Sequence, residues 1–540
     1  MLIAGATIAV NAQQWGESRQ LEDANVIIEK DRTIELPKAN RKFEQAPPVP
    51  VKSDEGQNLN YDFKNLNFRL STVDPQIRVF TIKEEPLDKL YGNYVKLGLG
   101  NYATSYAELF SNNKRNENLS AGVHFRHLSS LRGPVDGKNS ATASNELSAF
   151  GKYFSKPVTF SGGIKYHRDK YHFYGYDPAA EVSKDTLKQV FNGLVLNLDM
   201  QDNFIDSDIS VKLNTNFRLL GDSFDAREQQ FNMNFNLGYR LSDEMSADVE
   251  SDLLLSNYKN IGSINRSLFR IKPSFTFQID ELFTVQAGFN VVYENDTTRN
   301  KENVKFYPFA RADYQLTNNI QLYGRIGGDM IANTLYSFTR ENPYISQNVG
   351  LLHTNKTMEI SGGIKGNLLK ELAFDAGFSL GSYRAMPFYI NDPSDTTKFN
   401  IIYDQEGVTQ FNLFTELILN PSEVFRVSFR GDYFGYDTQQ FQEAWHKPKY
   451  KVGLSGYYNI YNKIAVTSDL YFMGGMKGLM KDQVIKLDSF ADLNLKFDYL
   501  FSDRFAAFLS FNNILGKNYQ LYLNYPSQGL LVMGGISYAF

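Results

Sequence analysis

Apolar and polar residues alternate one by one over long stretches of the chain, from about residue 91 to the end. In FNMNFNLGYRL, residues 231–241, every odd position is apolar or aromatic and every even position is Asn, Gly or Arg. The stretch DLNLKFDYL, residues 492–500, places Asp, Asn and Lys between Leu, Phe and Tyr in the same way. Successive side chains of a strand point to opposite faces. The pattern therefore predicts strands with one apolar and one polar face.

These strands are long and are separated by two kinds of connection. Many run for ten to fifteen residues, whereas strands of soluble domains average about five or six and a bilayer is crossed by about nine to eleven. Ten short turns alternate with longer, variable loops, which divides the region into eleven hairpins and about 22 strands, within a range of 18–22. The turns are expected at 113–118, 154–158, 201–208, 241–245, 279–283, 316–320, 368–372, 420–424, 460–464 and 501–505.

Short turns on one side and long loops on the other are typical of a bacterial outer-membrane barrel. We therefore predict an all-β fold, a transmembrane antiparallel β-barrel in the outer membrane of a Gram-negative cell, with both termini in the periplasm. Aromatic residues beside the turns, such as Tyr461, Phe501 and Phe505, fit the girdles at bilayer interfaces. The alternative is a soluble propeller or solenoid, but its repeats would carry shorter strands.

Composition restricts the function further. The chain has 540 residues, a net charge of -4 and a pI near 6.0, which argues against a nucleic-acid partner. It contains no cysteine, so disulfides, zinc thiolate sites and a thiol nucleophile are excluded. No catalytic or metal-binding motif is recognisable. We expect no enzymatic activity, no metal and no cofactor.

The first 90 residues differ in composition from the rest. Residues 1–12 are interpreted as the remnant of a signal peptide, with a cleavage site at Val10-Asn11-Ala12. Residues 13–90 form a periplasmic or lumenal extension, and residues 91–540 form the barrel. The extension is either a plain linker or a segment that orders on a partner protein. The residues expected to dock are Ile28, Ile34, Leu36, Phe43, Pro47 and Pro48.

Charged residues within the strands are expected to face the lumen, because a charge facing lipid near the midplane costs about 2–4 kcal/mol. Solvation is the simpler explanation for these charges, and substrate binding is the alternative. A barrel of this size has a lumen that needs an occupant, for which three candidates exist: the N-terminal extension, loops that fold inward, or a segment of a partner. The lumen-facing charges are Lys212, Arg218, Arg240, Arg426, Arg430, Asp432 and Asp498.

The chain ends in GGISYAF, a strand pattern that continues to the last residue. This strand is expected to pair with NYVKLGLGNY, residues 93–102, because no edge can remain unpaired in a membrane. The terminal aromatic is also expected to be the signal read by the barrel-assembly machinery. The residues assigned to closure and assembly are Val532, Ile536, Tyr538 and Phe540.

The last forty residues resemble the final hairpin of TonB-dependent receptor barrels. The resemblance lies in Asn513-Ile514-Leu515, Lys517-Asn518-Tyr519, Tyr525-Pro526-Ser527-Gln528-Gly529 and the final Phe. The resemblance covers roughly residues 91–540; before the last forty it is architectural, and it implies the 22 strands of that family. Receptors of this family carry a far longer plug domain than the about 78 residues between Gln13 and Leu90, which do not match it. The resemblance thus implies a plug-less relative of the Bacteroidota type.

Two functions follow as hypotheses. The protein is a solute channel or transport-related pore, or it is the barrel subunit of a larger outer-membrane complex. The alternatives are a TonB-dependent uptake receptor with the short N-terminal region as a reduced plug, and an outer-membrane enzyme. Expected partners are lipopolysaccharide and phospholipid of the outer membrane, the barrel-assembly machinery, and a periplasmic or outer-membrane protein bound through residues 13–60.

Overall fold

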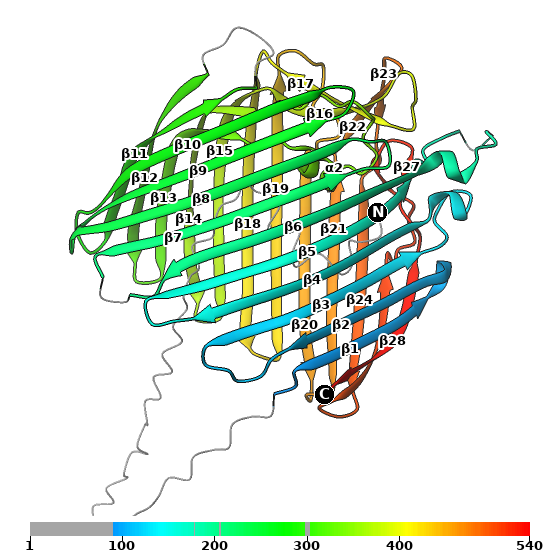
Figure 1. Cartoon of the computed structure of the whole chain (residues 1–540), viewed down its shortest axis with the longest axis horizontal. Helices are drawn as coiled ribbons and strands as arrows, with labels where there is room; N and C mark the ends of the chain where they lie inside the picture. Colours follow the sequence, from blue (N-terminus) through cyan, green and yellow to red (C-terminus); the bar gives the residue numbers. More distant parts are fainter. Residues whose placement is uncertain (1–89, 178, 205–206, 297–302) are drawn as a thin grey trace, which may run out of the picture. The chain divides into compact units, whose positions relative to one another are not determined.

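The computed structural model describes residues 90–177, 179–204, 207–296 and 303–540. The signal remnant and the docking residues predicted between positions 1 and 89 lie outside the described residues. Twenty-two strands form one antiparallel sheet that closes on itself (Figure 1). The predicted fold class and strand number are therefore confirmed.

The barrel strands are 8–16 residues long. The first eleven are β1 (Asn93–Gly100), β2 (Thr104–Asn112), β3 (Leu119–Ser130), β4 (Thr142–Phe154), β5 (Val158–His172), β6 (Lys188–Asp202), β7 (Ile209–Gly221), β8 (Arg227–Ser242), β9 (Met245–Lys259), β10 (Ser263–Gln278) and β11 (Phe283–Glu294). The others are β12 (Val304–Thr317), β13 (Ile320–Ile331), β14 (Thr354–Leu369), β15 (Leu372–Arg384), β18 (Val408–Ser422), β19 (Phe425–Thr438), β20 (Tyr450–Ile460), β21 (Ile464–Gly474), β24 (Phe490–Leu500), β25 (Phe505–Asn512) and β28 (Leu531–Ala539).

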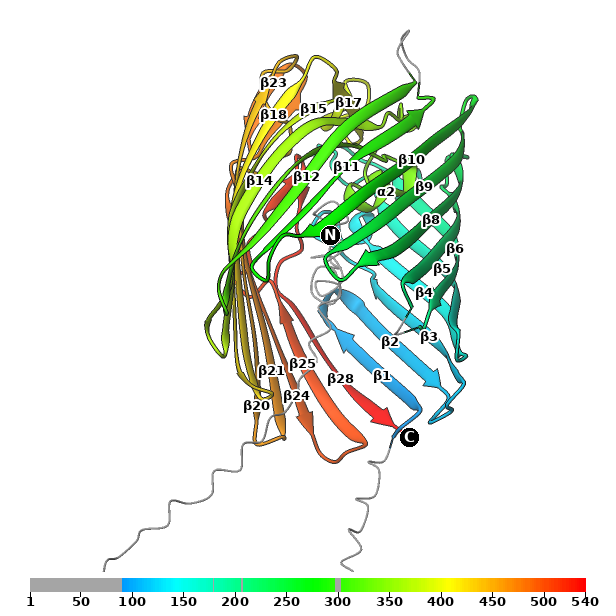
Figure 2. The ribbon, with the colours of Figure 1, turned by 90° about the vertical axis from the view of Figure 1, so that its left-hand side faces the viewer.

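All ten predicted turns fall on connections of two to six residues between neighbouring strands, from the β2–β3 connection to the β24–β25 connection. They lie at one end of the barrel, here called the turn end, and the longer connections lie at the opposite loop end (Figures 1 and 2). Both ends of the barrel chain reach the turn end. There the N–H of Asn93 donates to the carbonyl of Phe540 (3.0 Å), and the N–H of Phe540 donates to the carbonyl of Asn93 (2.9 Å).

The barrel closes where β28 pairs with β1, as the sequence predicts (Figure 2). Ile536 lies opposite Leu97, and Tyr538 lies opposite Val95. Ile536 is 50% exposed and Tyr538 is 44% exposed, so these side chains belong to the apolar outer face. The pairing leaves no free edge, which a sheet surrounded by hydrocarbon requires because lipid offers no hydrogen bonds.

The inner face of this seam depends on glycine. Gly98 and Gly535 lie directly opposite each other on β1 and β28, and the ring of Phe508 lies over both. A Cβ atom at Gly98 would lie 2.7 Å from Phe508 Cζ. Two non-bonded carbon atoms do not approach each other so closely, so a side chain at this position would displace the ring. The ring covers backbone that has no side chain of its own, and Lys96 Nζ lies 4.2 Å from the centre of this ring.

The remaining elements lie in the connections at the loop end (Figure 1). They are the helix α2 (Leu335–Glu341), the hairpins β16 (Met386–Asn391) with β17 (Phe399–Asp404), β22 (Lys477–Met480) with β23 (Gln483–Lys486) and β26 (Gln520–Tyr522) with β27 (Tyr525–Pro526), and the 3-10 turns η1 (Asn101–Ala103), η2 (Lys138–Ser140) and η3 (Lys184–Leu187). Among the described residues, no helix is both long and apolar enough to cross a membrane.

Deleting Phe540 is expected to lower the amount of folded barrel in the outer membrane of a Gram-negative host, because we predict that the terminal aromatic is the assembly signal. The measurement is heat-modifiable migration of the outer-membrane fraction. The matched control is Phe501→Ala, which removes another exposed aromatic at the turn end. Normal levels of the deletion variant would contradict the assignment.

Candidate functional site

The connections at the loop end build a hydrophobic core of their own, here called the loop cap. Its members come from the β5–β6, β7–β8, β13–β14, β15–β18 and β25–β28 connections and from the strand ends beside them. The buried residues of the loop cap are Tyr171, Phe173, Tyr174, Tyr176, Leu187, Phe191, Leu220, Ala226, Tyr258, Leu335, Phe338, Tyr344, Ile345, Val349, Leu351, Tyr389, Phe399, Ile401 and Tyr525.

Three tyrosines from three different connections meet in the loop cap. The rings of Tyr344 and Tyr525 stack with their centres 3.7 Å apart, and the ring of Tyr174 lies 4.8 Å from that of Tyr525. The hydroxyls of Tyr344 and Tyr174 are hydrogen-bonded at 3.3 Å. Burial, the largest cause, raises the pKa of Tyr344 well above its ordinary value. All three side chains are almost completely buried, so the connections hold one another in place.

The helix α2 carries the β13–β14 connection to strands that are far away around the sheet. Arg340 forms an ion pair with Asp169 of β5 (3.3 Å), and the ring of Tyr336 lies 4.0 Å from the guanidinium of Arg218 on β7. The N–H of Tyr336 donates to a carboxylate oxygen of Glu228 on β8 (3.1 Å). Since β13 and β5 are separated by seven strands, these contacts cross the barrel mouth. The long loops therefore fold inward, which was one of the three candidates for the lumen.

A buried ion pair joins the β13–β14 connection and Asp296, which follows β11, to the wall. Arg266 of β10 donates to both carboxylate oxygens of Asp296 (2.6 and 2.5 Å), and it contacts the ring of His353 (3.1 Å). Burial raises the pKa of Asp296, but the bonds from Arg266 outweigh it and leave the pKa below its usual value. Burial and Arg266 lower the pKa of His353 to about 3, so this imidazole is neutral.

A second buried histidine, His446 of the β19–β20 connection, packs against Phe399 of the loop cap and uses both ring nitrogens. Nδ1 lies 2.8 Å from the carbonyl oxygen of Tyr389, and Nε2 lies 3.3 Å from the backbone nitrogen of Leu523. A carbonyl can only accept and a backbone N–H can only donate. The network therefore assigns the proton to Nδ1 and leaves Nε2 as the acceptor. Burial lowers the pKa of His446 to about 4.

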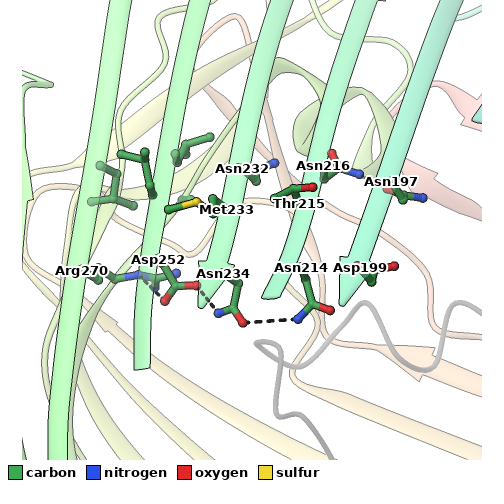
Figure 3. A pocket seen from close by; sticks show the side chains of 14 residues that line it. Asn197, Asp199, Asn214, Thr215, Asn216, Asn232, Met233, Asn234, Asp252 and Arg270 are labelled. Carbon is green, nitrogen blue, oxygen red and sulfur yellow. Dashed lines mark hydrogen bonds and ion pairs between the residues drawn. The ribbon is translucent and has the colours of Figure 1, made fainter. Parts of the chain in front are cut away.

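A polar pocket of about 370 Å³ lies on the wall formed by β6–β10 (Figure 3). Five of the residues that line the pocket are asparagines, and Leu254, Leu268 and Ala332 form its apolar part. The other lining residues are Asn197, Asp199, Asn214, Thr215, Asn216, Asn232, Met233, Asn234, Asp252, Leu253 and Arg270.

The pocket is organised by a row of side chains across four neighbouring strands (Figure 3). Arg270 Nε lies 3.4 Å from Asp252 Oδ2, and Asn234 Nδ2 donates to Asp252 Oδ1 (2.6 Å). Asn214 Nδ2 donates to Asn234 Oδ1 (3.5 Å). In the part of the chain that the structure describes, Asn216 Oδ1 is buried and accepts no hydrogen bond. Such an acceptor is available to a ligand.

This arrangement suits binding. Each amide offers donors and an acceptor, so the wall can match a ligand that carries both. Within residues 90–177, 179–204, 207–296 and 303–540, no group of three or more His, Asp or Glu residues is placed to hold a metal ion.

The structure brings several of the predicted lumenal charges into contact with other charges. Lys212 and Arg218 share one face of β7 with Asn214 and Asn216, the face that lines the pocket. Arg430 forms ion pairs with Glu416 (3.0 Å) and Asp432 (2.9 Å).

The other predicted charges lie near the turn end or at the seam. Asp498 forms ion pairs with Lys496 (2.6 Å) and Lys96 (4.0 Å). Arg240 and Arg426 are exposed near the turn end and do not take part in the pocket.

Neither the asparagine row nor the loop cap was predicted from the sequence. The recurrence of Asn at positions 232, 234 and 236 was present in FNMNFNLGYRL as a signal. The tyrosine-rich loops also carry a signal, since Tyr336 and Tyr344 belong to the connection TLYSFTRENPYISQ.

Comparison with known proteins identifies the fold. No protein-family model and no curated protein matches the chain. Among solved structures, the FrpB iron transporter of Neisseria meningitidis superimposes with a TM-score of 0.65 at 12% identity, over 84% of this chain and 82% of that chain. The siderophore receptor PirA of Acinetobacter baumannii gives 0.64 at 10% identity, over 84% and 81%. FpvA of Pseudomonas aeruginosa, in complex with a pyoverdine, gives 0.62 at 12%, over 83% and 72%. The barrel thus has the fold of siderophore-receptor barrels.

Replacing Tyr344 with Ala is expected to loosen the loop cap, because the substitution removes a stacked ring from a packed core. Large-to-small changes of buried aromatics cost about 3–5 kcal/mol. Hydrogen exchange of the amides of α2 should accelerate, while that of β5–β10 should stay unchanged. Tyr461→Ala, which removes a ring that is 92% exposed at the turn end, is the control. Equal exchange in both variants would contradict the packing role.

The loop cap is expected to loosen at acidic pH through His446. Its folded pKa, about 4, lies below the value of about 6.5 for an exposed histidine, so unfolding of the loop cap takes up a proton. The stabilisation is complete above pH 6.5 and is lost as pH falls towards 4. Proteolysis of the β19–β20 connection at pH 7 and pH 4.5 measures this. His446→Gln should weaken the pH dependence, and an unchanged profile would contradict it.

Proposed function

We propose that the protein is a transport-related barrel of the outer membrane whose outer mouth is closed by its own loops. The observation that carries the proposal is the loop cap, in which Tyr344, Tyr525 and Phe399 are buried almost completely. A permanently open porin does not require a packed core across its mouth. In this proposal a polar solute reaches the amide-lined wall when the loops part.

The proposal assigns the closing barrier to the connections and needs no plug domain. The predicted lumenal charges then serve mainly to solvate the wall, and their mixed signs leave it without strong ion selectivity. Ion pairs such as Arg430 with Asp432 support this role. The named ligands of the similar structures, siderophores and pyoverdines, are a candidate class for this chain only through the shared fold.

Two alternatives remain. As the barrel subunit of a larger complex, the chain would keep its lumen filled by a partner segment or by residues 13–90. As a TonB-dependent receptor, it would use residues 13–90 as a reduced plug. Both alternatives place a second barrier below the loop cap. They therefore predict that the lumen stays blocked when the loop cap is removed, whereas the proposal predicts an open lumen.

Replacing residues 334–351 with a short Gly/Ser linker should convert a silent barrel into a conducting one. The deletion removes α2 together with Tyr344, which anchors the loop cap. Single-channel recording in planar bilayers is the measurement. The wild-type barrel is expected to carry little steady current, and the variant is expected to carry large, steady currents.

The control places the same linker at Lys481-Asp482, the exposed tip of the β22–β23 hairpin. It should remain silent. A silent 334–351 variant that still folds, judged by heat-modifiable migration, would contradict the proposal and favour a filled lumen. Large currents from the wild type would contradict the loop cap as the barrier.

A further inference from the structure

The outer face of β5 changes abruptly from apolar to basic near the loop end. Ile164 and Tyr166 are 45% and 42% exposed, and Arg168 and Lys170 follow on the same face because strand side chains alternate. The intervening residues point the other way. Asp169 contacts α2 through Arg340 (3.3 Å). Arg168 and Lys170 therefore lie outside the barrel, above its apolar surface.

The neighbouring strand β6 shows the same change. Leu196 and Leu198 are exposed on its outer face, and Lys188 lies on that face at the loop end, next to Lys184 of η3. The hydroxyl of Tyr166 donates to Asn192 Oδ1 (3.1 Å), across from β5 to β6. A tyrosine with its ring among apolar residues and its hydroxyl in a polar row is typical of a bilayer interface. Tyr166 and Asn192 therefore mark where the apolar outer surface of β5 and β6 ends.

The four side chains Arg168, Lys170, Lys184 and Lys188 form one uniformly basic group, here called the basic border. Lys170 lies within electrostatic range of the other three. In the described part of the chain, none of the four takes part in an ion pair, although Asp185 follows Lys184 in sequence. Several strand cations on the inner face, by contrast, have a carboxylate partner, as Arg270 and Arg311 do.

Two further cations lie on the outer face at the loop end, one on β8 and one on β9. Arg227 and Lys259 lie directly opposite each other in the sheet and are both exposed. Like charges in directly opposite positions destabilise a strand pair. An anion that bridges them would offset this repulsion.

We propose that the basic border binds the phosphorylated headgroup of an anionic glycolipid in the outer leaflet. Acyl chains would lie against the exposed leucines below it, and the phosphates would meet the cations above. The apolar surface continues directly into the charged group, which suits an amphipathic lipid better than a soluble anion. Four cations close together suit a headgroup with several negative charges, as phosphate groups provide. Each basic side chain near an anionic lipid surface raises the binding affinity about fivefold.

The test uses the full-length barrel in mild detergent and lipid A with two phosphates as the probe. Adding lipid A should raise the Tm of the wild type by several degrees, and native mass spectrometry should show bound lipid. The variant Arg168→Gln/Lys170→Gln/Lys184→Gln/Lys188→Gln should bind at least about tenfold more weakly. Raising the salt concentration should weaken the wild type towards the variant.

The matched control removes four cations at the turn end, with Lys114→Gln/Lys156→Gln/Lys370→Gln/Lys463→Gln, all exposed. It should bind lipid A as the wild type does. Chemically dephosphorylated lipid A should bind the wild type no more tightly than intact lipid A binds the basic-border variant. Equal binding of lipid A by the wild type and the basic-border variant would overturn the proposal. So would binding of the dephosphorylated probe to the wild type as tight as the binding of intact lipid A.

The proposal does not depend on transport. A basic-border variant that loses lipid A but keeps the conductance behaviour of the wild type still supports it. A barrel that fails to fold is recognised by heat-modifiable migration, and Lys170→Arg/Lys184→Arg/Lys188→Arg then tests the same site with its charge retained. This variant should bind as the wild type does, and loss of binding in it would contradict a role for charge.

Discussion

Closure of the sheet is the constraint on which the other features depend. A barrel in lipid must pair every backbone group within the sheet, so β28 and β1 join through Ile536 opposite Leu97 and the apolar side chains turn outward. The polar side chains must then cover the inner wall of a wide lumen. That wall cannot bury apolar surface against itself, because its opposite sides lie too far apart. The apolar core that a soluble protein builds between its sheets is built here by the connections, around Tyr344 and Tyr525.

This division explains the two kinds of polar group in the molecule. On the wall, amides and paired charges such as Asn234 with Asp252 satisfy one another along the sheet. Beside the loop cap, His446 uses both ring nitrogens in hydrogen bonds that join separate connections. The first arrangement leaves capacity for a ligand. The second fixes the connections to each other, and we expect it to respond to pH because a neutral imidazole is part of the packing.

The sequence predicted the barrel well because its signals are local and periodic. The alternation in residues 231–241 and the ten turns depend only on neighbouring positions, and the structure confirms them. The loop cap was accessible only as one of three candidates, since Tyr174, Tyr344 and Tyr525 meet across about 350 residues of sequence. The basic border was missed for a related reason. Arg168, Lys170 and Lys188 become one group only when the β5–β6 register is known, although each stands at the end of an apolar alternation.

The central claim is that the protein's own loops close the outer mouth above the polar wall. The chain has no cysteine, so a single Asn232→Cys substitution places one thiol in the pocket below the loop cap. The most direct measurement is the rate at which a membrane-impermeant maleimide, added outside intact cells, labels this thiol. Gly262→Cys, at an exposed tip with open space around it, provides the reference rate. The account predicts labelling of Asn232→Cys that is slower by orders of magnitude, and labelling as fast as at Gly262→Cys would contradict it.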